Sequence, residues 1–381
     1  MIRFYSLLLL FITSISLKAQ TVVRDVQYVN DTLRTHRLDI YIPTNANQAL
    51  PLAIYIHGGG WQGGTKGGGA GWLKAMINNG YVCADINYRL SGDSVWPAQL
   101  YDCKAAIRYL KANATQYHID TCRVGVIGSS AGGHLVSVLA TTGNYAALEG
   151  AHLGNAHVSS KVHAAIPAFG PVDFFQMDDY IPSTCTNPIV HSFNSPETHL
   201  LGCDSLKNCP SRVISANPVT YLDANDPPMY ITHGDADCSV PVRQSIVLDS
   251  NFRAVGVPTQ LHIAASEGHG APFFTTQQQQ IIYKAFFDTA LKVCINTSAQ
   301  TPTTNSSTSV YPNPVQQGIF YINAEATIEY LYVFDALGRQ VFKTDNVPTN
   351  TAINISELQK GFYTATFFVR GQVYRKALII E

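Results

Sequence analysis

Apolar and polar positions alternate along most of the chain in two rhythms. Short apolar runs bounded by Gly, Pro or Asn are typical of buried strands, whereas apolar residues repeated every three or four positions are typical of helices. The predicted strands are 36–42, 52–57, 81–88, 124–128, 162–169, 229–233 and 260–265, and the predicted helices are 72–79, 97–117, 131–141, 242–254 and 275–292. This order predicts a mostly parallel sheet with helices on both faces and a functional site at the carboxyl ends of the strands.

Three segments interrupt this rhythm and predict the domain boundaries. Residues 1–19 contain Arg3, then an apolar run, then small residues, which is the pattern of a secretory signal peptide. Residues from about 174 to 226 are rich in Pro, Asn, Ser and Cys, and we expect a small cap there. Residues 296–308 are mainly Thr, Ser, Asn, Gln and Pro, as in a linker. The large α/β domain is therefore expected to span 20–295.

Residues 309–381 differ in pattern from the rest of the chain. Stretches such as 329–334 and 363–367 alternate with a period of two and are separated by turn residues. They predict a small all-β, sandwich-like domain. No run after the signal peptide is long and apolar enough for a membrane-spanning helix, so we expect no transmembrane span.

Charge and cysteine content narrow the possible partners. The net charge is −1 and only 13% of the residues are charged, so nucleic acid is not an expected partner. Export permits disulfides among the eight cysteines. We expect Cys83 and Cys103 to be buried free thiols. We expect some disulfide pairing among four other cysteines, with Cys203–Cys209 as the first candidate; the four are Cys185, Cys203, Cys209 and Cys238. Neither C-x-x-C nor H-E-x-x-H occurs, so no metal site is predicted.

The segment 123–138 holds the strongest chemical signal. An apolar run ends at Gly128 and a helical pattern begins after Ser130, so a buried strand is expected to turn sharply into a helix. Gly128 to Gly132 fits G-x-S-x-G, in which the small residues prevent a Cβ clash at the turn. Glycine-rich turns of other doubly wound proteins can show the same pattern. Ser130 is the candidate nucleophile.

A serine nucleophile needs an imidazole to take its proton and a carboxylate to orient that imidazole. Two later predicted strands lead into loops with such groups, at the same sheet edge as Ser130. We select Asp237 as the acid, because it begins an Asp-x-x-Val-Pro sequence, and expect Asp235 to cap the turn. His269, between two glycines, is the candidate base. Three other histidines are expected to bind backbone groups: His57, His134 and His233.

Glycines after the strand 52–57 can bring backbone N–H groups close to a ligand. We expect an oxyanion hole from the amides of Gly59, Gly60 and Ala131. A phosphate-binding loop is the alternative, but the G-K-[ST] ending is missing. We expect substrate contacts from Trp61, Trp96 and Phe273. The aromatic residues Trp96, Tyr180, Phe273 and Phe274 could form a wall for an aromatic acyl group or could pack the cap against the core.

Together, these motifs resemble the secreted esterase/lipase family of α/β-hydrolases, and especially its bifunctional acetylxylan esterase and feruloyl esterase branch. The residues concerned are 57–61, 87–90, 96–99, Asp102 with 105–108, 128–134, 233–237 and 268–270. The resemblance implies a secreted serine carboxylesterase that forms an acyl-enzyme without a cofactor. The implied substrates are acetyl or feruloyl esters on plant cell-wall polysaccharide.

Residues 311–314, 335–341 and 358–363 resemble the C-terminal sorting domain of type IX secretion substrates. This resemblance implies that the type IX machinery is a partner and that the protein is released or held at the cell surface. A carbohydrate-binding module is the alternative, although all three Trp residues lie before residue 97. Two other functions stay open for the large domain: a peptidase or amidase with the same triad, and a non-catalytic hydrolase fold displayed at the surface.

Overall fold

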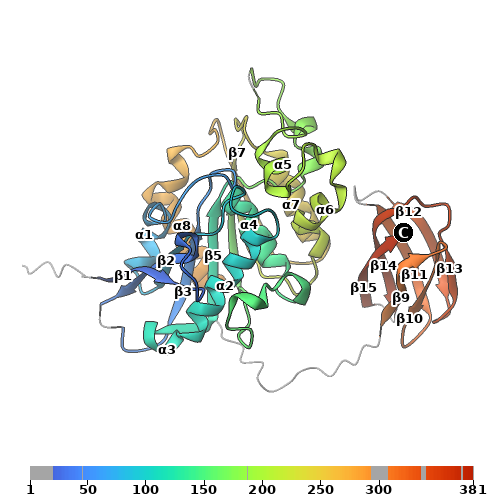
Figure 1. Cartoon of the computed structure of the whole chain (residues 1–381), viewed down its shortest axis with the longest axis horizontal. Helices are drawn as coiled ribbons and strands as arrows, with labels where there is room; N and C mark the ends of the chain where they lie inside the picture. Colours follow the sequence, from blue (N-terminus) through green and yellow to red (C-terminus); the bar gives the residue numbers. More distant parts are fainter. Residues whose placement is uncertain are drawn as a thin grey trace, which may run out of the picture.

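The computed structural model describes residues 20–44, 46–186, 188–292, 308–335, 340–369 and 372–380. The predicted signal peptide and nearly all of the predicted linker lie outside these residues. The described residues form two separate sheets, each with its own hydrophobic core (Figure 1). Among them, no helix has both the length and the apolar composition needed to cross a membrane.

The first sheet has eight strands in the order β1-β2-β4-β3-β5-β6-β7-β8. Its strands are β1 (Gln20–Gln27), β2 (Arg37–Pro43), β3 (Leu50–Ile56), β4 (Val82–Ile86), β5 (Ile119–Ser129), β6 (Ala164–Ala168), β7 (Met229–Gly234) and β8 (Thr259–Ala264). From β4 to β8 all neighbouring strands are parallel, and only β1 and β2 run antiparallel to their neighbours. The predicted mostly parallel sheet is confirmed, and the sequence pattern missed only the edge strand β1.

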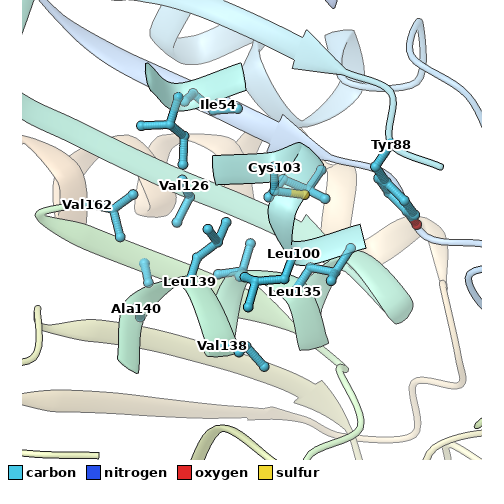
Figure 2. Close-up of a cluster of buried hydrophobic side chains, with 14 of the residues drawn as sticks. Ile54, Tyr88, Leu100, Cys103, Val126, Leu135, Val138, Leu139, Ala140 and Val162 are labelled. Carbon is cyan, nitrogen blue, oxygen red and sulfur yellow. The ribbon is translucent and has the colours of Figure 1, made fainter. Parts of the chain in front are cut away.

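Helices cover both faces of this sheet. They are α1 (Ala70–Ile77), α2 (Ala98–Ala112), α3 (Ala114–Tyr117), α4 (Ala131–Thr141), α5 (Pro196–Leu201), α6 (Pro210–Ala216), α7 (Arg243–Ala254) and α8 (Gln277–Ala290). Apolar residues of α1 and α8 pack on one face, and those of α2, α4 and α7 pack on the other. Figure 2 shows Leu135 and Leu139 of α4 near Ile54 and Val126 of the sheet. This packing fixes the start of α4 at the carboxyl end of β5.

The segment between β6 and β7 contains α5, α6 and several single-turn helices instead of one long crossover helix. This segment is called the cap below. Two disulfides involve it, Cys185–Cys238 and Cys203–Cys209. The second is the pair that the sequence favoured. Cys83 and Cys103 are free and buried, as predicted.

The second sheet has seven strands in the order β12-β11-β14-β15-β9-β10-β13. Their bounds are β9 (Ser309–Gln316), β10 (Ile319–Asn323), β11 (Ile328–Asp335), β12 (Gln340–Val347), β13 (Ala352–Asn354), β14 (Gly361–Val369) and β15 (Gln372–Ile380). Alternating residues such as Leu331, Val333, Ala365 and Phe367 form its buried core. The predicted C-terminal β domain is confirmed.

Candidate active site

Ser130 lies at the sharp turn between β5 and α4. Its backbone has φ 53° and ψ −121°, an unusual conformation for a residue with a side chain. The turn is held because the Ser130 amide donates a hydrogen bond to the carbonyl of Ala168 at 2.9 Å, and the Ser130 carbonyl accepts one from the His134 amide at 3.0 Å. The side chain of Ser130 therefore stands at the apex of the turn, above the carboxyl end of the sheet.

The glycines on either side of Ser130 are required by close packing. A Cβ at Gly128 would lie 2.5 Å from the carbonyl oxygen of Gly132. A Cβ at Gly132 would lie 2.1 Å from the carbonyl oxygen of Ile56, at the end of β3. The turn thus has no room for side chains at these two positions, which is the physical basis of the G-x-S-x-G pattern.

The loops after β7 and β8 bring Asp237 and His269 to Ser130. The Nε2 atom of His269 lies 2.9 Å from Ser130 Oγ, and its Nδ1 atom lies 2.7 Å from Asp237 Oδ2. A single chain of hydrogen bonds therefore joins the carboxylate, the imidazole and the hydroxyl. Nδ1–H donates to the carboxylate, so Nε2 is left to accept the serine proton, which is the arrangement required of a general base.

Asp237 is fully buried, but all around it are hydrogen-bond donors. Its Oδ1 atom accepts the amides of Ser239 at 2.8 Å and Val240 at 2.9 Å, and its Oδ2 atom lies 3.3 Å from His233 Nε2. Burial by itself would raise the pKa of Asp237, but the hydrogen bonds from His233 and His269 outweigh it and lower the pKa below its ordinary value. The carboxylate is therefore ionised at neutral pH and can hold His269 in one tautomer.

The other groups near the triad bind backbone atoms. His57 Nδ1 lies 2.8 Å from the Gly58 carbonyl, His134 Nε2 lies 2.7 Å from the Ala216 carbonyl and His233 Nε2 lies 2.8 Å from the Val240 carbonyl. Asp235 accepts the amide of Ser266 at 2.6 Å, as a turn-capping carboxylate does. These contacts are the structural roles that the sequence suggested for the four residues.

The glycine loop after β3 passes directly over the nucleophile. A Cβ at Gly58 would lie 3.2 Å from the Cβ of Ser130, and the next two residues, Gly59 and Gly60, have φ angles of 112° and 60°. Within the described residues, the amides of Gly59, Gly60 and Ala131 donate no hydrogen bond to a protein group. These three residues line the same pocket as Ser130, so their amides are free to donate to a bound group.

A pocket of about 570 Å³ opens at Ser130 and His269. Its aromatic wall consists of Trp61, Trp72 and Phe169, and the ring of Phe169 meets that of His269 edge-on at 4.9 Å. Trp72 and Phe169 were not among the predicted substrate contacts. Phe169 directly follows β6, beside the nucleophile strand, and that position at a strand end is a signal that could have identified it.

Two of the predicted substrate contacts do not line this pocket. The indole N–H of Trp96 donates to Ser215 Oγ at 3.0 Å, so its ring is turned toward α6. Phe273 packs against His262 and Phe274, with ring centroids 5.8 and 5.5 Å away. Of the two roles considered for Trp96, Tyr180, Phe273 and Phe274, an aromatic wall is therefore not formed at Ser130, since none of the four lines this pocket. Only Trp61, of the three predicted contacts, lies at the pocket.

The cap contributes a buried ionic pair to the pocket that sequence reasoning missed. His191 Nδ1 lies 3.1 Å from Glu197 Oε2, and both side chains are almost fully buried. Burial alone would lower the pKa of His191, but the contact with Glu197 raises it above the ordinary value. Neither residue lies in a recognisable motif. The two come together only when the cap folds, so the sequence gives no signal for the pair.

Residues 38–252 match the BD-FAE family, and residues 309–381 match the secretion system C-terminal sorting domain. Relatives in Mycobacterium tuberculosis include the probable carboxylic ester hydrolase LipM, 31% identical over 215 residues that cover 56% of this chain and 47% of LipM. The esterase LipQ of the same organism is 27% identical over 58% of this chain and 50% of its own length. The chain thus spans about half the length of the curated relatives it matches.

Two solved structures are similar in fold and exceed 30% sequence identity. One is a truncated carbohydrate esterase from gut microbiota, with a TM-score of 0.64 and 32% identity over 72% of this chain and 97% of that protein. The other is the bifunctional GH43-CE protein of Bacteroides eggerthii, with a TM-score of 0.63 and 33% identity over 71% of this chain and 38% of that protein.

Proposed function

The chain belongs to the BD-FAE family of α/β-hydrolase esterases, and from this premise we propose that it is a secreted serine carboxylesterase with Ser130, His269 and Asp237 as its catalytic residues. The observation that supports the proposal most strongly is the unbroken hydrogen-bond chain from Asp237 through His269 to Ser130 Oγ. The free amides at Gly59, Gly60 and Ala131 supply the second requirement of acyl transfer, since they can bind a developing negative charge.

The reaction follows from these positions. His269 Nε2 takes the proton of Ser130 as Oγ attacks the ester carbonyl, and the three amides stabilise the oxyanion of the tetrahedral intermediate. When that intermediate collapses, His269 gives the proton to the departing alcohol and leaves Ser130 acylated. Water, deprotonated by the same imidazole, then attacks the acyl-enzyme and releases the acid. No group beyond those of the protein and water is needed in this scheme.

We propose that the substrates are acetyl or feruloyl groups on plant cell-wall polysaccharide. Support comes from the similarity to a carbohydrate esterase and to the GH43-CE protein, both above 30% identity. A pocket lined by Trp61, Trp72 and Phe169 can take a planar aromatic acid as well as a small acyl group. Measuring ferulate and acetate released from arabinoxylan distinguishes the two acyl groups.

Residues 309–381 indicate export through the type IX secretion system, to the cell surface or the outside of the cell. The cap disulfides fit this destination, because disulfides persist in oxidising compartments. An extracellular location also gives the protein access to polysaccharide that cannot enter a cell.

Replacement of the nucleophile tests the proposed reaction. Ser130→Ala is expected to lower kcat/KM for p-nitrophenyl acetate by at least about a thousandfold with an unchanged melting temperature. Ser137→Ala, which removes a buried serine hydroxyl within α4, is the matched control and should keep the wild-type rate. Activity retained by Ser130→Ala would contradict the assignment. A matched amide substrate and a fluorophosphonate label test the amidase and the non-catalytic alternatives.

A further inference from the structure

A second pocket lies beside the catalytic one and shares a wall with it. Its volume is about 560 Å³, and its lining comes from Gln62, from loop residues 91–95 and from cap residues 198–204. Gln62 lines both pockets, and His199 of the second pocket lies two residues after Glu197 of the first. A ligand in the second pocket would therefore be a direct neighbour of one held at the nucleophile.

The shared wall contains a hydrogen bond between the oxyanion loop and the cap. The amide nitrogen of Gln62 donates to His199 Nδ1, so the ring proton of His199 is on Nε2, which donates to Asn194 Oδ1 at 3.1 Å. The amide oxygen of Gln62 is not used in this bond. Gln62 and His199 are both exposed, so polar groups of the wall are accessible to a ligand.

The loop that forms the opposite side of this pocket is anchored at both ends. Before it, Arg89 forms a bidentate ion pair with the buried carboxylate of Asp102, and the distance from Arg89 Nη2 to Asp102 Oδ1 is 2.6 Å. After it, the amide of Trp96 donates to the carbonyl of Leu200 in α5 at 2.7 Å. The pocket is therefore preformed, which lowers the cost of ligand binding. These anchors, Arg89 and Trp96, belong to the sequence motifs 87–90 and 96–99.

The polar groups around this pocket are suited to hydroxyl groups. Its lining among the described residues contains the amide of Gln62, the hydroxyls of Ser91 and Thr198, the imidazole of His199 and the carboxylate of Asp204, and no Lys or Arg. An anionic ligand would find no Lys or Arg among the described lining residues, since the nearby guanidinium of Arg212 is already bonded to the carbonyls of Leu201 and Gly202. A fatty acyl chain would find Val95 as the one aliphatic side chain in that part of the lining. A neutral carbohydrate satisfies the same donors and acceptors without either cost.

We propose that the second pocket is a carbohydrate subsite, which holds sugar units of the polysaccharide while an ester on a nearby unit enters the catalytic pocket. The proposal rests on the proposed function for the identity of the ester. A small acyl group offers few contacts itself. The sugar units bound in the second pocket would supply the binding free energy by which the enzyme recognises an ester on the polysaccharide.

Gly92 allows this pocket to be filled without disturbing the fold. It is exposed, and a Cβ built on it meets no atom within 4 Å. We expect Gly92→Trp to lower kcat/KM for acetylated and feruloylated xylo-oligosaccharides by at least about tenfold, mainly through KM. Its kcat/KM for p-nitrophenyl acetate should stay within about twofold of wild type. Gly68→Trp, at another exposed glycine with no atom within 4 Å and outside both pockets, should change neither rate.

Calorimetric binding measurements separate this proposal from the esterase activity. At least one of the unesterified neutral xylo- and manno-oligosaccharides should bind the Ser130→Ala protein, and Gly92→Trp or Asp204→Ala in that background should weaken this binding by at least about tenfold. The subsite is refuted if neither kind of sugar binds, or if Gly92→Trp and Asp204→Ala leave both the binding by the Ser130→Ala protein and the turnover of oligosaccharide esters by the protein with Ser130 unchanged. If sugar binds in this pocket but no ester is cleaved, the proposed function fails and the subsite stands.

Discussion

The disulfide between Cys185 and Cys238 fastens the cap to the loop of the catalytic acid, because Cys238 directly follows Asp237. It closes a loop across a sequence separation of 53, whereas Cys203–Cys209 closes one of only 6. In the chain-entropy description, a cross-link stabilises the folded protein by restricting the unfolded chain, more so for longer loops. The two separations correspond to stabilisations of about 4 and about 2 kcal/mol.

Paired Cys→Ser variants test this difference. At about 2 °C per kcal/mol for a domain of this size, we expect the melting temperature to fall by about 8 °C without Cys185–Cys238 and by about 4 °C without Cys203–Cys209. The first variant should also lose activity at temperatures below its transition, because the amides that hold Asp237 belong to the loop it releases. Scanning calorimetry and p-nitrophenyl acetate hydrolysis on the full chain measure both effects.

The order of the two melting temperatures shows whether unfolded-chain entropy governs these cross-links. If loss of Cys203–Cys209 destabilises the protein as much as loss of Cys185–Cys238, unfolded-chain entropy does not govern these cross-links. If loss of Cys185–Cys238 lowers the melting temperature but leaves kcat unchanged well below the transition, the disulfide stabilises the cap without positioning the acid.

Four further substitutions have outcomes that the geometry sets. Asp237→Asn should lower kcat by roughly 10⁴-fold, since the amide favours the wrong imidazole tautomer, whereas Asp235→Ala should keep most of the activity; a turnover assay compares them. Burial raises the pKa of Asp226 to about 7, so the contribution of this carboxyl group to the free energy of unfolding falls as pH rises from about 4 to about 7. The melting temperature of Asp226→Asn relative to that of the wild type should therefore be higher at pH 8 than at pH 4. Gly132→Ala would place a methyl group 2.1 Å from the Ile56 carbonyl oxygen and should destabilise the protein by about 3 kcal/mol or more in urea unfolding, and wild-type stability would contradict this.

The fold could be predicted because its central strands are buried on both faces. Apolar runs such as those of β3, β5 and β7 stand out from the helices between them, and their order implies parallel pairing. The edge strand β1 gives no such signal, since its residues are half-buried or exposed and are held by backbone pairing with β2. The predicted helix 97–117 is interrupted at Asn113, which is a boundary residue of both α2 and α3.

Ser130, Asp237 and His269 could be predicted because each lies in the turn or loop that follows a recognisable strand, so the order of the strands brings them to one edge of the sheet. The wall of the pocket could not be predicted in the same way. The direction of Trp96 depends on Ser215, 119 positions later, and the pairing of His191 with Glu197 depends on the path of the cap. Long-range contacts of this kind leave no local pattern in the sequence.

The start of α4 has an electrostatic consequence beyond the exposure of Ser130. Peptide dipoles along this 11-residue helix sum to a partial positive charge at its first turn, where the amide of Ala131 has no acceptor in the part of the chain that the structure describes. That partial charge is present before any substrate binds. In the proposed reaction it stabilises the ester carbonyl oxygen, which becomes negative during acyl transfer. The turn between β5 and α4 thus places the side-chain oxygen of Ser130 and the positive end of the helix dipole at the same point, and the dipole favours attack by that oxygen.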